Sequence, residues 1–485
     1  MKTREILSAA FICLAMVCNA QILRHPSFLY CDNNTVKVTR IEYAPNATIL
    51  TFKTTKECVP TLKVDHGVFI VDDNGQRHYA INADGIKLDS LYIIPEGETR
   101  RFSISFGPAS ESNQALDVRG SGMFSIYGLH DADSKLGIPK AQCEVNNNEV
   151  DSSCFKTDWV DIEGVFHDDS DKNSTIYARY NTERTSIREN KYNKYSTIDD
   201  EGRFHMRFLM YAPSNVQLSR GQFSAESFGE IYLHPGDKVH VDIYKRGRSI
   251  EVISKNLVGK KSYNNLMNAP VIAPDILWFN SLVYHYAYDE TMYNDCAARL
   301  NKGYAKALKC VDYICWHYKF SPYESALYTE CINAKYVKML TSLALLRQSA
   351  GEAVDYSYLR YLDPENVTIP FICTETLVPA TIVQLSPFRK CHEQVDENDA
   401  NRWMKVIDLQ HQEFERIMGH SGYPFLFQMM VVEDYASVFN WKPADERQYQ
   451  QVRDWLTSPY CKKRLDIMHG ELLDKSKTIS GQTTN

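Results

Sequence analysis

Cys310 and Cys315, which precede Trp316, come closest in this sequence to a redox-active thiol pair. Catalytic dithiols commonly stand in a Cys-x-x-Cys element at the start of a helix, where the pKa of one thiol is lowered. No Cys-x-x-Cys element occurs anywhere in the chain. Residues five apart on one helix point in different directions, which makes a disulfide between them awkward. The spacing therefore favours two thiols buried in an apolar core.

His411, Glu415 and His420 lie close together on a predicted helix and could in principle bind a metal. A zinc peptidase needs two histidines four residues apart, with a glutamate beside the first. Here the residue four positions after His411 is Glu415, so the motif is incomplete. We expect solvated surface residues or an ion pair on the helix, and no metal.

Asp169, Asp171 and Asn173 reproduce the first ligands of a calcium-binding loop. That loop needs a glycine where this chain has Ser174, and a distal glutamate where it has Tyr180. The segment therefore lacks both the sharp turn and the bidentate ligand. A polar hairpin loop is the better interpretation.

No other catalytic signature is present in the sequence. It contains no glycine-rich phosphate loop, nucleophile elbow or dinucleotide fingerprint. We therefore predict no cofactor, no metal and no catalytic residue. Carboxylates that are distant in sequence can still converge in a fold, so a hydrolase stays open as an alternative.

The amino terminus has the pattern of a signal peptide. Lys2 and Arg4 precede an apolar run at residues 6–17, which is too short to span a bilayer. Cleavage is expected after Ala20, which makes Gln21 the first residue of the mature protein. The residues before the two cysteines of this segment are large, which disfavours a lipoprotein. We predict a periplasmic or secreted bacterial protein.

Composition bounds the rest of the chain. Its 485 residues allow about three domains of roughly 150 residues each. A net charge of -7 without a dense basic stripe argues against nucleic acid or an anionic membrane as the main partner. No later stretch is long and apolar enough to form a transmembrane segment.

The cysteines allow two short-range disulfides. Of 13 cysteines two leave with the signal peptide, so the odd number that remains leaves at least one thiol unpaired. Cys31 with Cys58, and Cys143 with Cys154, are the candidate pairs, each able to stabilise the fold by about 3 kcal/mol. Burial of these thiols in apolar cores is the alternative.

Residues 21–135 are predicted to form a β-sandwich-like domain. Short β-branched and aromatic runs occur at residues 36–41, 48–52, 67–71, 78–81 and 102–106. The Asp73-Asn74-Gly75 segment is typical of a tight hairpin turn. In the last run Phe102, Ile104 and Phe106 alternate with serines, which gives one apolar and one polar face.

A polar linker at residues 136–155 precedes a second β domain at residues 156–256. This domain contains a turn at residues 199–202 and a strand at residues 203–210. In that strand, Phe204, Met206 and Phe208 are expected to face the core. A turn at residues 234–237 leads into another strand.

Residues 257–474 are predicted to be helical, followed by a flexible tail at residues 475–485. Ser321, Pro322 and Glu324 form a capping box that begins a long helix. Helical periodicity continues at residues 401–418, 424–439 and 444–455, and Ser458-Pro459 begins the last helix. The expected fold class is α+β multidomain, with two antiparallel β-sandwich-like domains followed by an α-helical domain.

Three segments carry a family resemblance: Ala83-Asp84-Gly85-Ile86-Lys87-Leu88-Asp89, Met123-Phe124-Ser125-Ile126-Tyr127-Gly128-Leu129 and Leu233-His234-Pro235-Gly236-Asp237. Together they resemble segments of multidomain periplasmic TlpA-like proteins of the thioredoxin family. The resemblance implies β domains and a helical segment ahead of a thioredoxin domain. That family's chemistry lies in a Trp-Cys-x-x-Cys element, which this sequence lacks. It therefore implies an accessory or divergent member, with no catalytic residue carried over.

The leading hypothesis is a noncatalytic exported binding or scaffold protein that holds a protein or glycan partner. One alternative is an accessory protein in thiol-disulfide redox chemistry, acting with a thioredoxin supplied in trans. The other is the hydrolase whose site is not visible in the sequence.

Overall fold

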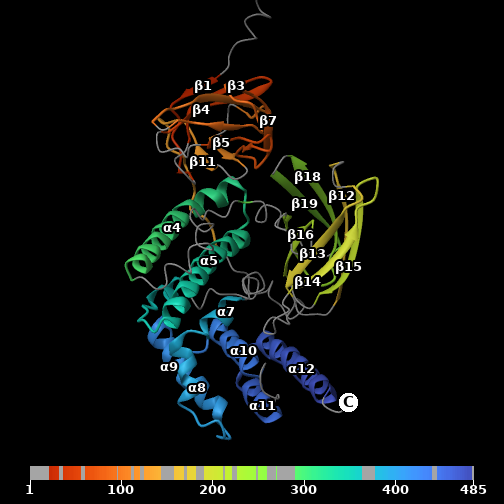
Figure 1. Cartoon of the computed structure of the whole chain (residues 1–485), viewed down its shortest axis with the longest axis vertical. Helices are drawn as coiled ribbons and strands as arrows, with labels where there is room; N and C mark the ends of the chain where they lie inside the picture. Colours follow the sequence, from red (N-terminus) through yellow and green to blue (C-terminus); the bar gives the residue numbers. More distant parts are fainter. Residues whose placement is uncertain are drawn as a thin grey trace, which may run out of the picture. The chain divides into compact units, whose positions relative to one another are not determined.

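The structure is a computed structural model of the whole chain (Figure 1). It describes residues 21–31, 36–55, 61–95, 97–110, 114–120, 125–143, 158–168, 172–181, 191–210, 214–220, 227–246, 249–258, 269, 290–362, 377–439 and 445–482. The chain divides into two compact units. The first comprises Met1–Lys140, Lys245–Ile250 and Asp312–Lys319, and the second comprises Ala141–Tyr244, Glu251–Val311 and Phe320–Asn485.

A nine-stranded sheet dominates the first unit, in the order β1-β3-β4-β9-β7-β6-β10-β11-β2. A small two-stranded sheet, β5-β8, accompanies it. The strands are β1 Gln21–Arg24, β2 Tyr30–Cys31, β3 Val36–Ala44, β4 Ala47–Thr54, β5 Thr61–Lys63, β6 Phe69–Val71, β7 Arg77–Asp84, β8 Leu91–Ile93, β9 Arg101–Phe106, β10 Leu116–Arg119 and β11 Ser125–Leu129. The five β runs predicted here from the sequence are confirmed.

Alternation along the strands builds the core of this unit. In β9 the side chains of Phe102, Ile104 and Phe106 are buried, as the sequence predicts. Phe102 stacks on Phe52 of β4 with ring centroids 5.2 Å apart. Between β6 and β7 the predicted turn is present, with Gly75 at a φ of 76°.

Asp117 of β10 links this sheet to a segment much later in the chain. Its carboxylate is buried and accepts hydrogen bonds from the Tyr313 hydroxyl at 2.5 Å and the Tyr318 hydroxyl at 3.1 Å. The amide of Gly128 donates a third, at 2.9 Å. Burial and the nearby Asp117 raise the pKa of both tyrosines well above the ordinary value. These contacts explain why residues 312–319 belong to the first unit.

Two four-stranded sheets follow in the second unit, in the orders β15-β12-β18-β19 and β14-β13-β16-β17 (Figure 1). Phe166 meets Phe228 and Tyr180 stacks on Phe208, each pair joining the two sheets. The strands are β12 Asp158–Phe166, β13 Thr175–Asn181, β14 Lys191–Thr197, β15 Arg203–Met210, β16 Ser214–Ser219, β17 Ser227–Leu233, β18 Lys238–Arg246 and β19 Ser249–Val258.

The pairing of β12 differs on its two sides. It runs antiparallel to β15 but parallel to β18, with Ile162 beside Val239. The inward face of β15 is as predicted, since Phe204, Met206 and Phe208 are all buried. The turns before β15 and β18 are also present at the predicted positions, and Gly202 has a φ of 81°.

Helices occur at the five positions that capping and periodicity predict, near residues 321, 401–418, 424–439, 444–455 and 459, and also at positions that neither signal marks. They are α4 Glu290–His317, α5 Pro322–Ser349, the short 3-10 helix η4 Ser357–Tyr361, α7 Leu377–Ile382, α8 Ser386–Glu393, α9 Arg402–Met418, α10 Phe425–Phe439, α11 Glu446–Trp455 and α12 Pro459–Gln482. The capping box of Ser321 and Glu324 is formed at the start of α5. The last helix continues to Gln482, well into the segment predicted as a tail. The fold class, α+β multidomain, is confirmed.

None of the helices in the described part of the chain is long and apolar enough to cross a membrane.

Candidate binding face

The outer face of the sheet that contains β12 carries polar and aromatic side chains. Along β12, Val160 and Ile162 point into the sandwich and are buried, whereas Trp159, Asp161 and Glu163 alternate with them on the outside. This alternation is the period of two that a half-buried strand requires. Strands β15 and β18 contribute further outward side chains in the same way.

We call this surface the β12 face. It is formed by Trp159, Asp161, Glu163, His167, His205, Arg207, Lys238, His240, Asp242 and Tyr244.

The strand register places these side chains in rows across the sheet. Asp161 lies between Arg207 of β15 and Lys238 of β18. Glu163, two residues on, lies between His205 and His240. These two carboxylates are therefore flanked on both sides by nitrogen-containing side chains, and groups of complementary charge neighbour one another.

Three histidines contact the carboxylates of the face. His167 Nε2 lies 2.8 Å from Asp242 Oδ1, and His240 Nε2 lies 3.6 Å from the same oxygen. The other ring nitrogen of His240 is 3.7 Å from Glu163 Oε1. On the opposite side, His205 Nε2 is 3.4 Å from Asp161 Oδ1. The centre of the face is thus an alternating set of imidazoles and carboxylates.

Two aromatic side chains stand at the ends of this polar centre. Trp159 is 49% exposed, and the Arg207 guanidinium lies 5.1 Å from its ring centroid. Tyr244 is 36% exposed and stacks on His167, with centroids 4.3 Å apart and ring planes 2° from parallel. Such stacking holds both rings in fixed orientations at the surface.

The chemistry of this face is hydrogen bonding and stacking. Among the described residues no group of three or more His, Cys, Asp or Glu side chains is arranged to hold a metal ion. A neutral imidazole has one donor and one acceptor nitrogen, carboxylates accept, and Arg207 and Lys238 donate. The face therefore offers donors and acceptors side by side.

A second polar cluster lies inside the helical region. Asp434 of α10 binds His392 Nε2 at 2.6 Å and the amide of Gln410 at 2.7 Å. Beside it, Glu433 accepts from the guanidinium of Arg464 at 2.5 Å, and both side chains are almost fully buried. These contacts join α10 to α8, α9 and α12, so they satisfy polar groups within the helix packing.

The structure tests only some of the predictions made for the cysteines. Cys310 and Cys315 both lie on α4 and are buried, as predicted for core thiols. Cys58 and Cys154 are not among the described residues, so the pairings Cys31–Cys58 and Cys143–Cys154 stay predictions.

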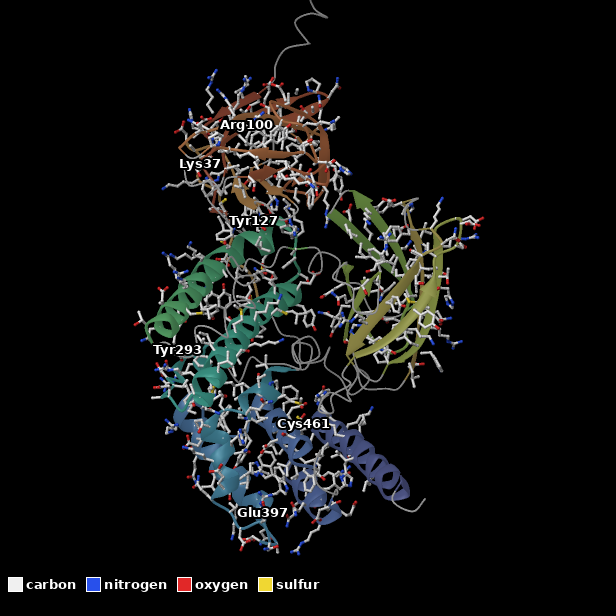
Figure 2. The ribbon with its side chains drawn as sticks, viewed as in Figure 1. Lys37, Arg100, Tyr127, Tyr293, Glu397 and Cys461 are labelled. Carbon is white, nitrogen blue, oxygen red and sulfur yellow. The ribbon has the colours of Figure 1, made fainter. Side chains whose placement is uncertain are left out.

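Two other thiols have strongly perturbed acidity. Burial, with a smaller contribution from Glu413 and Asp434, raises the pKa of Cys391 to about 11. Burial raises the pKa of Cys461, which lies on α12 (Figure 2), to about 12. A thiol with so high a pKa stays protonated at neutral pH and is a poor nucleophile.

Of the helical histidine motif, His411 and Glu415 lie on one face of α9, as the sequence predicts, whereas His420 lies beyond the end of that helix at Met418. His411 Nε2 lies 3.8 Å from Glu415 Oε1, four residues along α9. The same nitrogen is 2.5 Å from the carbonyl oxygen of Gly422, which accounts for its position.

The calcium-like segment is only partly described. Asp169 and Asp171 lie outside the described residues. The side-chain amide of Asn173 donates to Asp200 Oδ1 at 2.7 Å, which ties two neighbouring turns together. Tyr180, at the distal ligand position, is buried in the sandwich core. The predicted signal peptide, residues 1–20, also lies outside the described part, so export stays a prediction.

Sequence reasoning missed the β12 face. The alternation at residues 203–210 predicts that Phe204, Met206 and Phe208 face the core, and the same pattern places His205 and Arg207 outside. The alternation of Trp159, Asp161 and Glu163 was an equally readable signal. Only the strand register, however, shows that these two outward sets are neighbours.

Comparison with known proteins identifies no family for this chain. No protein-family model matches the sequence, and no curated protein matches it. The TlpA-like resemblance therefore stays a prediction.

Solved structures give only distant similarity. A putative cell adhesion protein from Bacteroides uniformis ATCC 8492 is 10% identical over 45% of this chain and 76% of its own, with a TM-score of 0.14. A sugar binding protein, pneumolysin, is 8% identical over 46% of this chain and 50% of its own, with a TM-score of 0.13. A structure described as pT26-6p is 9% identical over 98% of this chain and 96% of its own, with a TM-score of 0.16. Scores this low carry no functional argument.

Proposed function

We propose that this protein is an exported binding protein without catalytic activity of its own, and that the β12 face holds its partner. The observation that carries the proposal is Trp159, a half-exposed indole on a sheet face, set beside Arg207 and a row of hydrogen-bonding side chains. Tryptophan, tyrosine and arginine are the residues most often found at the energetic centres of binding surfaces.

The ordering of the face supports this proposal. Binding immobilises side chains, and that loss of freedom opposes association. The ion contacts of His205 and His240 and the stacking of Arg207 and His167 already restrict these side chains. A preorganised surface of this kind loses less entropy when a partner arrives.

An array experiment tests the proposal. Mature protein, residues 21–485, is applied to one array of glycans and one of extracellular proteins, alongside Trp159→Ala and the control Tyr195→Ala. Tyr195 is 66% exposed but lies on β14, in the other sheet of the sandwich. We expect the unmodified protein to bind at least one ligand on either the glycan array or the protein array. Binding of that ligand should be at least tenfold weaker for Trp159→Ala and unchanged for Tyr195→Ala. Absence of binding, or equal binding by Trp159→Ala, would overturn the proposal.

A further inference from the structure

The chemistry of the β12 face is ordered along the strand, with one aromatic side chain at each end and charged groups between. Trp159 and His167 are eight residues apart, which corresponds to about 26 Å at about 3.3 Å per residue. Tyr244 stacks on His167 and so marks the far end. The amide of His167 donates to the carbonyl of Ile243 at 2.9 Å, so the two strands remain paired at this end.

This order is the reverse of a typical protein-protein interface. Protein partners usually bury an apolar centre, enriched in aromatic residues and depleted of charge, inside a polar rim. Here the centre is the row His205, Glu163 and His240, and the aromatic residues are at the ends. Pressing a protein onto it would desolvate three polar side chains at once.

The balance of charge argues against a polyanionic ligand. Asp161, Glu163 and Asp242 face the same surface as the permanent cations Arg207 and Lys238. A nucleic acid or an acidic polysaccharide would meet these three carboxylates along its whole length, and like charges brought together are repelled.

A neutral sugar chain matches the groups on this face, whereas a protein partner and a polyanion do not. Every hydroxyl group is both a donor and an acceptor, so a row of hydroxyls can pair with neighbouring carboxylates, imidazoles and cations without leaving a group unsatisfied. The flat, C–H-bearing face of a sugar ring is apolar and can cover an exposed aromatic ring such as Trp159. A linear chain can make both kinds of contact in the order in which the β12 face presents them.

We infer that the ligand is a neutral, linear glycan that lies along β12, with one sugar ring on Trp159, another against Tyr244, and hydroxyl groups bound by the charged centre. This inference rests on the proposed function and names its ligand class. It requires that a chain long enough to reach both aromatic side chains binds more tightly than a short one, because linked contacts add without a second loss of translational freedom.

Titration calorimetry with sugars of defined length tests the inference. The probes are neutral glucans, mannans and xylans, each as a disaccharide-to-octasaccharide series and as polymer, with oligogalacturonate as the acidic comparison. We expect at least one neutral series to bind with an affinity that rises with length, and oligogalacturonate to bind at least tenfold more weakly.

Variants assign the two ends. Trp159→Ala and Tyr244→Ala are each expected to weaken binding of the longest sugar at least tenfold. In both variants the affinity for long chains should approach the affinity for short chains, because only one aromatic contact remains at the ends of the face. Tyr195→Ala is the folded control with an intact face.

The outcomes distinguish failure of the glycan inference from failure of the proposed binding function. Binding of a deglycosylated protein that depends on Trp159, with no neutral sugar bound, would overturn the glycan inference and leave the binding function standing. Tighter binding of oligogalacturonate than of any neutral sugar would also overturn it. No binding to sugars or proteins at all would overturn both.

Discussion

A single carboxylate, Asp72, closes the turn between β6 and β7. Its Oδ1 accepts from the amides of Asn74 and Gln76, both at 2.9 Å, and its Oδ2 lies 3.0 Å from His78 Nε2. Burial alone would raise the pKa of Asp72, but the hydrogen bonds from His78, Gln76 and Asn74 together lower it below the ordinary value. The ionised form is therefore the one that the folded protein stabilises.

Replacing Asp72 should destabilise the first unit and reduce its sensitivity to acid. We expect Asp72→Ala to lower the free energy of unfolding by about 1 to 3 kcal/mol at pH 7, since it removes the acceptor of the hydrogen bonds from Asn74, Gln76 and His78. Because the pKa of Asp72 is lower in the folded state, its contribution is present above about pH 3.9 and is lost as pH falls below that value. Urea unfolding at pH 7 and pH 3 measures this.

The matched control is Asp84→Ala, since Asp84 is exposed at the end of β7. Equal destabilisation by the two variants would contradict the role of Asp72.

Buried thiols allow a direct test of the redox alternative. Cys391 and Cys461 should resist alkylation by iodoacetamide at pH 8 after mild reduction, until denaturant is added, because burial keeps them protonated. Exposed Cys143 should react in the folded protein. Peptide mass mapping measures each site. Rapid labelling of Cys391 or Cys461 in the native state would show that these sites open.

The same thiols should make the helical region sensitive to alkali. Their pKa values are raised in the folded state, so the stabilisation is full below the ordinary thiol value of about 8.5 and falls as pH rises above it. This is the opposite direction from Asp72.

At the scale of elements, strand β12 depends on a glycine. A Cβ atom at Gly164 would lie 2.6 Å from the carbonyl oxygen of Val241, a backbone atom of the parallel neighbour β18. Gly164→Ala should therefore lower the free energy of unfolding by about 1 to 3 kcal/mol, since β12 and β18 must move apart.

Chemical denaturation, compared with Gly137→Ala, measures this effect. A Cβ at Gly137 meets no atom within 4 Å, so that control should change stability little. If the two variants had equal stability, the close approach of β12 and β18 would be in doubt.

The sequence predicts individual helices and strands better than it predicts which strands pair with one another. Alternation in β9 and β15 and the capping box of Ser321 are local signals, complete within a few residues, and all of them are confirmed. The parallel pairing of β12 with β18 is not local, because the paired residues, such as Ile162 and Val239, are far apart in the chain and local patterns do not encode their contact. The β12 face could not be assembled from sequence for the same reason.

At the scale of the whole molecule, the first unit is discontinuous in sequence. Asp117 and Tyr313 are 196 residues apart, yet they share a buried hydrogen bond. No composition shift or motif marks this contact, and residues 312–319 carry the ordinary pattern of a helix end. The predicted domain at residues 21–135 could not include them.

Removing one hydroxyl group should loosen this attachment. Tyr313→Phe keeps the ring and deletes the donor to Asp117, leaving a buried carboxylate with one partner fewer. We expect a loss of about 1 to 3 kcal/mol and faster amide hydrogen exchange in residues 312–319 and in β10. Exchange followed by mass spectrometry measures both segments in the intact chain.

Tyr293→Phe is a suitable control, because Tyr293 lies on α4 but outside residues 312–319 (Figure 2). Unchanged exchange in β10 of Tyr313→Phe would contradict the role of Asp117 as the attachment point.

The separation of Asp117 from Tyr313 also has a consequence for biogenesis. At about 5 to 20 residues per second, a ribosome that has just added Asp117 needs about 10 to 40 s to reach Tyr313. During most of that interval the nascent sheet holds a carboxylate whose two tyrosine partners, Tyr313 and Tyr318, do not yet exist. Codon usage between these two positions, and the chaperones present while they are translated, should therefore influence the yield of soluble protein more than the same changes made after codon 319.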